Sequence, residues 1–352
     1  MAISLSSAMF RSATQIAAQA MKRAAAAPAA TASALSVAPR TAAPPKPRKQ
    51  ASPRPRPAAA PRNASFRSAV HDCAFGQRRY KIYTPKMAKE AGPLPLVVML
   101  HGCGQTPDDF AKGTRMNALA EELGLMVVYP AQPRDANSSR CWNWFRRGDQ
   151  SRGAGEPALI ASLVSEVIAQ HPVDPLRVYV AGLSAGGSAA LILAGAYPDI
   201  FAAVGTHSGL PAGAARDKTS AMMAMKQGNP GDRRAAAMPT IIFHGSEDRV
   251  VSPRNSRFAA LRALEPFPTL RATEVTRKAA EGRSYVRTTH RFGQGRPRVE
   301  YWLVKGSGHA WSGGSPAGRF VDPQGPDASR EMVQFFLRHR LNARKLPTRR
   351  PG

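Results

Sequence analysis

The amino-acid sequence predicts an α/β fold, with a mostly parallel sheet and helices on both faces, in a single domain. Three observations lead to this prediction. Strand-like and helix-like segments alternate almost throughout residues 79–340. Several of the expected strands are continuous apolar runs, as in parallel strands that are buried on both faces. Residues 178–197 have the pattern of a buried strand, a sharp turn and a helix.

The clearest strands are the apolar runs at residues 96–100 and 125–129, the second of which stops at Pro130. A short strand of alternating character is expected at residues 79–83. The remaining strands are expected at residues 178–181, 202–206, 240–243 and 300–304. Together these segments supply the central sheet.

Apolar side chains recur at helical spacing between the strands. Residues 156–171 are typical, because Leu159, Leu163 and Val167 form one stripe and Pro157 stands in the first turn. Further helices are expected at residues 108–122, 188–197 and 329–340. Residues 212–237 are rich in Ala, Gly and Met, and we expect them to cross over the sheet as a candidate lid.

The charge is strongly basic and lies mostly at the chain ends. Lys and Arg number 50 against 23 Asp and Glu, and residues 1–67 hold no acidic residue. So little apolar bulk cannot offset the entropy of ordering such a segment. We therefore expect a disordered basic Ala/Pro-rich arm at residues 1–67, a catalytic domain at residues 68–340 and a basic tail at residues 341–352.

A nucleophile motif follows the strand at residues 178–181. It has the form G-x-S-x-G, with Ser184 between Gly182 and Gly186, and the next helix follows directly. Glycines are needed there because the neighbouring backbone approaches closely at such a turn. The context predicts Ser184 as a nucleophile; a tight structural turn is the alternative.

A serine nucleophile needs a base and an orienting acid, which follow in the order Ser, Asp or Glu, His in α/β-hydrolases. Asp248 and His309 fit this order, since each comes just after an expected strand. Glu247 is the alternative acid. Other histidines also end strands and are more typical of loop hydrogen bonding: His101, His207 and His244. The order predicts an α/β-hydrolase.

Two backbone amides should stabilise the oxyanion of a tetrahedral intermediate. Ala185 follows the nucleophile and is the first candidate. Cys103, in the glycine-containing loop after residues 96–100, is the second, with Gly104 as the alternative.

Several longer motifs accompany the triad candidates. These are His101-Gly-Cys-Gly-Gln-Thr106, Cys141-Trp-Asn-Trp-Phe145, Gly155-Glu-Pro157, Gly182-Leu-Ser-Ala-Gly-Gly187, His244-Gly-Ser-Glu-Asp248 and Gly306-Ser-Gly-His-Ala-Trp-Ser-Gly-Gly314. The combination resembles the polyhydroxybutyrate (PHB) depolymerase family of esterases over residues 79–339. The resemblance implies an α/β-hydrolase fold and ester hydrolysis through Ser184, Asp248 and His309. It also implies relatives that act on short-chain polyhydroxyalkanoates, or on acetyl and feruloyl esters of plant polysaccharides.

The three cysteines allow at most one disulfide. Cys103 and Cys141 are both expected in loops at the carboxyl end of the sheet, so they could pair and leave Cys73 free. Such a pair would indicate an oxidising compartment; two buried free thiols are the alternative.

Three of the four tryptophans, Trp142, Trp144 and Trp311, fall in the same loops and are candidates for lining a substrate mouth. Ordinary core packing is the alternative for each of them.

The expected partner is an ester substrate, which could be polymeric. We expect no cofactor, no metal and no membrane span, because no cysteine–histidine cluster or long apolar run is present. A polyanion-binding or granule-binding protein is the competing class, and the basic arm is a candidate for contact with an acidic surface. Nucleic acid is not expected as the main partner. The family resemblance implies the extracellular region, with the cytoplasm as the alternative, because residues 1–20 fit a secretory signal poorly.

Overall fold

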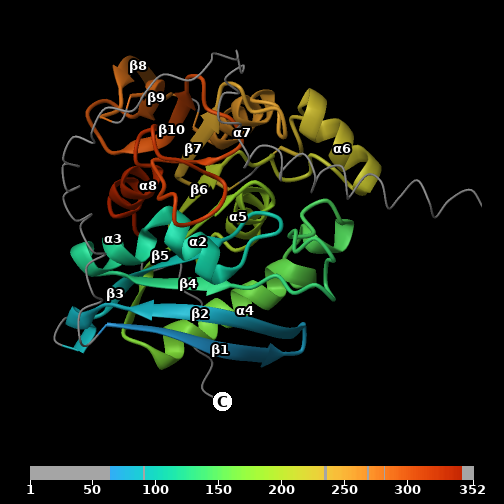
Figure 1. Ribbon diagram of the computed structural model, residues 1–352, viewed down its shortest axis with the longest axis vertical. Coiled ribbons are helices and arrows are strands. Elements are labelled where there is room, and N and C mark those ends of the chain that lie inside the picture. The colour runs from blue at the N-terminus through green and yellow to red at the C-terminus, as the bar shows by residue number, and fades with distance from the viewer. Residues whose placement is uncertain (1–63, 90–91, 234–235, 268, 281, 343–352) are drawn as a thin grey trace, which may run out of the picture.

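The computed structural model describes residues 64–89, 92–233, 236–267, 269–280 and 282–342 (Figure 1). Most of the expected arm (residues 1–63) and most of the expected tail (residues 343–352) lie outside these residues. The first strand, β1 (Ser65–Cys73), begins inside the range expected for the arm. Its Phe66 ring packs 5.7 Å from the ring of Tyr129. The folded domain therefore begins before residue 68, because this aromatic contact adds apolar packing to the end of β1.

One ten-stranded sheet forms the centre of the domain, in the order β1-β2-β4-β3-β5-β6-β7-β10-β9-β8. Six strands form its parallel part: β3 (Leu94–Leu100), β4 (Met126–Pro130), β5 (Val173–Leu183), β6 (Ala203–His207), β7 (Thr240–Gly245) and β10 (Pro297–Val304). The predicted α/β-hydrolase type of sheet is confirmed, and each of these strands matches an expected apolar run.

Antiparallel strands flank the parallel part on both sides. β1 and β2 (Gly76–Thr84) form a hairpin at one edge, and β8 (Arg271–Lys278) and β9 (Ser284–Arg291) lie at the other. The sequence did not indicate β1, β8 or β9. The reason is clearest for β8, in which seven of the eight residues are exposed, so that no apolar run marks the strand.

Helices cover both faces of the sheet, as predicted (Figure 1). One face carries α4 (Gly155–Gln170), α5 (Ala185–Ala196) and α7 (Arg254–Leu264), and the other carries α2 (Pro107–Thr114), α3 (Met116–Leu123) and α8 (Ala328–Phe336). The alternation of side chains along a strand separates the two cores. In β3, Leu96 and Val98 face the first core, and Val97 and Met99 face the second.

The helix expected at residues 108–122 is two helices, which is a correction. Arg115 has φ 54° and ψ 21°, in the left-handed region, and so ends α2 and begins α3. Its guanidinium donates to the carbonyl of Gly313 at 3.1 Å. A distant loop therefore holds the break, which helical periodicity alone could not reveal.

The candidate lid contains α6 (Lys218–Gln227), which Asp217 and Ser220 cap reciprocally. This segment is fastened to its neighbours, since Ser252 N–H donates to the Met225 carbonyl at 2.7 Å. The minor elements are the 3-10 turns η1 (Lys86–Lys89) and η2 (Arg147–Asp149) and the short strands β11 (Trp311–Ser312) and β12 (Val321–Asp322). Within the described ranges, no helix is both long and apolar enough to cross a bilayer.

Candidate active site

The three triad candidates follow parallel strands, and the carboxyl ends of these strands lie at the same end of the sheet. Ser184 follows β5, Asp248 lies three residues beyond β7, and His309 lies five residues beyond β10. Within the sheet, β6 joins β5 to β7, and β10 pairs directly with β7. Parallel pairing therefore brings together three residues that are up to 125 positions apart in the chain.

Ser184 occupies a strained turn between β5 and α5. Its φ of 57° and ψ of −120° are rarely adopted by residues other than glycine. A Cβ on Gly186 would lie 2.1 Å from the Leu100 carbonyl oxygen, and one on Gly182 would lie 2.3 Å from the Gly186 carbonyl carbon. Only glycine fits at these two positions. The Ser184 N–H donates to the His207 carbonyl at 2.8 Å, which fixes the turn against β6.

The acid and the base are directly joined. His309 Nδ1 lies 2.7 Å from Asp248 Oδ2, and both side chains are almost fully buried. Burial alone would raise the pKa of the Asp248 carboxyl, but the charges and hydrogen bonds of His309 and His244 hold it well below its usual range. The amides of Val250 and Val251 also donate to Oδ1. Asp248 is therefore ionised and can orient His309 through an Nδ1–H donor.

The alternative acid, Glu247, does not share this geometry. Its side chain is exposed, while Asp248 lies in the buried contact with His309. His244 Nε2 lies 3.2 Å from Asp248 Oδ2 and 2.9 Å from the Val251 carbonyl. Sequence reasoning missed this second histidine beside the acid, because only the fold of the loop after β7 brings Asp248 back to His244, which lies on β7.

His309 Nε2 is the atom that would accept a proton. It is buried and has no hydrogen-bond partner among the described residues. No hydrogen bond joins it to Ser184 Oγ, although both side chains stand at the same end of the sheet. Such contacts are often long before substrate binds and shorten in the reacting complex. The unused Nε2 is the acceptor that the predicted chemistry requires.

The amides that are expected to form the oxyanion hole differ in whether they already have a hydrogen-bond partner. The Gly104 N–H donates to the Ser139 carbonyl at 2.8 Å, which removes the alternative donor. In the part of the chain that the structure describes, the amides of Cys103 and Ala185 have no such partner. The contact of Gly186 with the Leu100 carbonyl places this loop against the start of α5. Two unoccupied amides therefore lie on either side of the serine turn.

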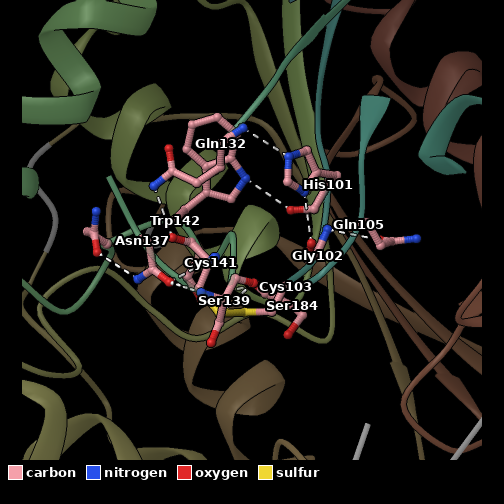
Figure 2. Close-up of a disulfide and its surroundings, with 12 residues drawn as sticks. His101, Gly102, Cys103, Gln105, Gln132, Asn137, Ser139, Cys141, Trp142 and Ser184 are labelled. Atoms are coloured by element: carbon pink, nitrogen blue, oxygen red, sulfur yellow. Dashed lines mark hydrogen bonds between the residues drawn. A yellow bond between two sulfur atoms is a disulfide. The ribbon is translucent and has the colours of Figure 1, made fainter. Parts of the chain in front are cut away.

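A disulfide links Cys103 to Cys141, with their Cα atoms 4.2 Å apart, and Cys73 is a free thiol (Figure 2). Figure 2 shows Ser184 in the immediate surroundings of this bond. The bond attaches the Cys103 loop to the loop that carries Trp142, 38 positions along the chain. It therefore constrains the backbone of Cys103, one of the two candidate oxyanion donors.

Two other strand-ending histidines hold these loops. The backbone N–H of Gln132 donates to His101 Nε2 at 3.1 Å, so His101 Nδ1–H is left to donate to the Gly102 carbonyl at 2.8 Å (Figure 2). The Ser312 amide donates to His207 Nε2 at 3.1 Å, which fastens the loop that carries His309. Burial lowers the pKa of His101 to about 4 and that of His207 to about 3. Both rings are therefore neutral near pH 7.

The three tryptophans that were candidates for lining a substrate mouth are buried, as the core-packing alternative expects, and their contact with a substrate stays a prediction. The exposed fractions of Trp142, Trp144 and Trp311 are 0%, 5% and 1%. Trp142 Nε1–H donates to the His101 carbonyl at 3.0 Å, and Trp311 Nε1–H donates to Ser329 Oγ at 3.0 Å. Buried Trp142 and Trp311 therefore fix the loops next to Cys103 and His309.

Among the described residues, no group of three or more metal-binding side chains is present. The arrangement contains instead the parts of covalent acyl transfer. These are a candidate nucleophile on a strained turn, a histidine with one unpaired nitrogen, an ionised carboxylate and two amides without a partner.

A family model described as "Esterase PHB depolymerase" matches residues 78–288. Poly(3-hydroxyalkanoate) depolymerase C of Paucimonas lemoignei is 35% identical over 246 residues, which cover 65% of this chain and 56% of that protein. Feruloyl esterase B of Neurospora crassa is 31% identical over 252 residues, which cover 65% of this chain and 82% of that protein. The chain thus spans little more than half of the depolymerase and most of the feruloyl esterase.

Among solved structures, the acetyl xylan esterase from Aspergillus awamori superposes with a TM-score of 0.61 at 22% identity. The match covers 78% of this chain and 99% of that chain. At 22% identity this match supports the α/β-hydrolase type of fold, and the superposition covers nearly the whole acetyl xylan esterase chain.

Proposed function

Because this chain belongs to the PHB depolymerase family of esterases, we propose that it hydrolyses carboxylic esters through an acyl-enzyme on Ser184. The observation that carries the proposal is the joined pair of Asp248 and His309 beside a strained serine turn, with His309 Nε2 unpaired. Each of these features has a defined task in acyl transfer. None of them is needed for a binding module.

In the acylation step, His309 Nε2 takes the proton of Ser184 Oγ while the oxygen attacks the ester carbonyl carbon. The amides of Cys103 and Ala185 donate to the oxyanion of the tetrahedral intermediate. Collapse of the intermediate breaks the ester C–O bond, and His309 returns the proton to the leaving alcohol. A water molecule then attacks the acyl-enzyme by the same route, which releases the acid and regenerates Ser184.

The proposed substrate is a short-chain polyhydroxyalkanoate, PHB or its oligomers. The similarity to depolymerase C supports this choice, because it has the highest identity of the two relatives described above. A feruloyl or acetylxylan type of carbohydrate ester is the second candidate. It is favoured by the larger share of the feruloyl esterase that the alignment covers, 82% against 56% for the depolymerase. The basic arm before β1, at residues 1–64, is proposed to contact an acidic surface, which would gather the enzyme on a particulate substrate.

The test of the chemistry is Ser184→Ala, for which turnover of p-nitrophenyl butyrate should fall on the order of 10^6-fold. Asp248→Asn should lower turnover by ~10^4-fold, because His309 would lose its orienting carboxylate. Glu247→Gln is the matched control and should leave turnover unchanged, since its side chain is exposed. A folded Ser184→Ala chain that keeps a tenth of the activity would exclude Ser184 as the nucleophile.

The substrate is decided by a separate comparison of PHB granules, hydroxybutyrate oligomers, methyl ferulate and acetylated xylan. We expect the highest kcat/KM for the hydroxybutyrate oligomers. Higher kcat/KM for methyl ferulate or acetylxylan would replace the first candidate by the second while leaving the ester chemistry in place.

A further inference from the structure

A cationic cavity lies on the face of the sheet that carries α8, away from the triad. Its volume is about 390 Å³, and its wall includes Arg287, Thr289, Arg291, Arg296, Glu300 and Arg338. The wall uses residues 297 and 300 at the start of β10, whereas His309 follows the opposite end of that strand. Figure 1 shows β9, β10 and α8 together at the side of the molecule far from β1 and β2. The cavity is therefore separate from the proposed ester site.

Strand register explains why the arginines meet. Arg287, Thr289 and Arg291 alternate along β9, so their side chains point to the same face. On β10 their partners are Trp302, Glu300 and Pro297. Arg296 immediately precedes β10, and Arg338 follows the end of α8. Four arginines, from β9, from the loop before β10 and from the segment after α8, therefore line one cavity.

Acidic side chains do not balance this charge. Glu300 is buried, accepts from Trp302 Nε1 at 3.1 Å and lies 3.6 Å from an Arg338 nitrogen. Glu331 on α8 is a second acid; burial raises the pKa of its carboxyl, and the charges of Arg287 and Arg338 act in the opposite direction. Two carboxylates therefore stand against four arginines. The cavity keeps a positive excess even if both acids are ionised.

Two of the arginines each have one nitrogen without a hydrogen-bond partner. The Nε atoms of Arg287 and Arg291 are buried and have no hydrogen bond among the described residues. Neither guanidinium forms an ion pair within that part of the chain; Arg287 lies over the Trp302 ring, 5.0 Å from its centre. Both side chains are half-buried, and a buried N–H donor without an acceptor is unfavourable, so an anion in the cavity would supply acceptors to these two nitrogens.

We propose that this cavity binds an anion with several phosphoryl groups. Planar guanidinium groups match the oxygens of phosphate in pairs, and an array of them favours multiply charged oxyanions over chloride. The volume is within the range of small-molecule sites, about 300–1,000 Å³, so the cavity has room for more than one phosphoryl group. The chemical class is a diphosphate or triphosphate, free in solution or displayed as lipid phosphate headgroups.

The experiment is calorimetric titration of the full chain with inorganic pyrophosphate and tripolyphosphate at about 0.15 M salt, where attraction to exposed charges is screened beyond about 8 Å. We expect saturable binding with one site per chain. Arg287→Gln/Arg291→Gln should weaken binding at least tenfold. Arg67→Gln/Arg79→Gln removes the same charge from exposed positions on β1 and β2 and should change the affinity less than twofold.

Arg291→Gln alone is the second variant, because Arg287 packs on Trp302 and its loss could affect folding. Turnover of p-nitrophenyl butyrate serves as the folding control, since no cavity residue belongs to the proposed catalytic set. Vesicles with and without phosphatidate distinguish the source of the phosphate. If the chain binds phosphatidate vesicles but not the soluble phosphates, and Arg291→Gln loses this binding, the site is assigned to lipid phosphate. Absence of saturable binding to any phosphate probe, or equal affinity in the pocket and control variants, would overturn the proposal.

Discussion

Removal of the disulfide between Cys103 and Cys141 tests how the fold holds its oxyanion loop. The double variant Cys103→Ala/Cys141→Ala opens a loop of 38 positions. Constraint of a loop of that length in the unfolded chain corresponds to about 4 kcal/mol of stability. We therefore expect the variant to lose about 2–4 kcal/mol in its free energy of unfolding.

Activity should fall less than it would if the Cys103 amide were absent. Loss of one oxyanion donor typically costs ~10^2–10^3-fold in kcat. In the variant, the hydrogen bond from Gly104 to Ser139 and that from Gly102 to Gln105 Oε1 still hold the loop. The amide is loosened and not removed, so we expect kcat to fall about tenfold, which is about 1.4 kcal/mol of activation free energy. KM should change little, because the amide acts on the transition state.

The assay is urea unfolding and p-nitrophenyl butyrate kinetics of the oxidised chain, with Cys73→Ala as the matched control. Cys73 is a free thiol on β1, so its variant should behave as the parent chain does. The reasoning fails if the double variant unfolds within about 1 kcal/mol of the parent chain and keeps its kcat.

Three further predictions rest on packing, titration and the domain boundary. Gly186→Ala should give an unstable, inactive chain, because the new methyl group would lie 2.1 Å from the Leu100 carbonyl oxygen; circular dichroism and kinetics check this. Burial depresses the folded-state pKa of His101 to about 4 and of His207 to about 3, so the unfolded chain binds more protons below about pH 6.5. The free energy of unfolding should therefore decrease as the pH is lowered through this window, by about 2 kcal/mol per histidine at about pH 5. Urea unfolding at equal salt measures it, and a constant free energy of unfolding from about pH 7 to 5 would contradict the prediction. A chain that begins at residue 64 should melt several degrees above one that begins at residue 69, which lacks the contact of Phe66 with Tyr129; equal melting temperatures would remove β1 from the folded core.

The sequence by itself determined the parts whose constraints are local. Gly182 and Gly186 mark the serine turn, because a Cβ at either position would meet backbone atoms. The apolar runs of β3 and β4 indicate strands buried on both faces, since every residue in each run is buried. Ser184, Asp248 and His309 could also be found from the sequence, because each follows an expected strand and their chain order is that of an α/β-hydrolase.

The tertiary structure alone decided what depends on neighbours that are distant in the chain. Trp142 and Trp311 are apolar loop residues by sequence, and only the packing around them makes them core anchors. His244 contacts Asp248 because the loop after β7 folds back, a result that spacing does not encode. The arginine cavity exists because β9 pairs with β10 in one particular register. A shift of that register by one residue would turn Arg287 and Arg291 to the other face of the sheet.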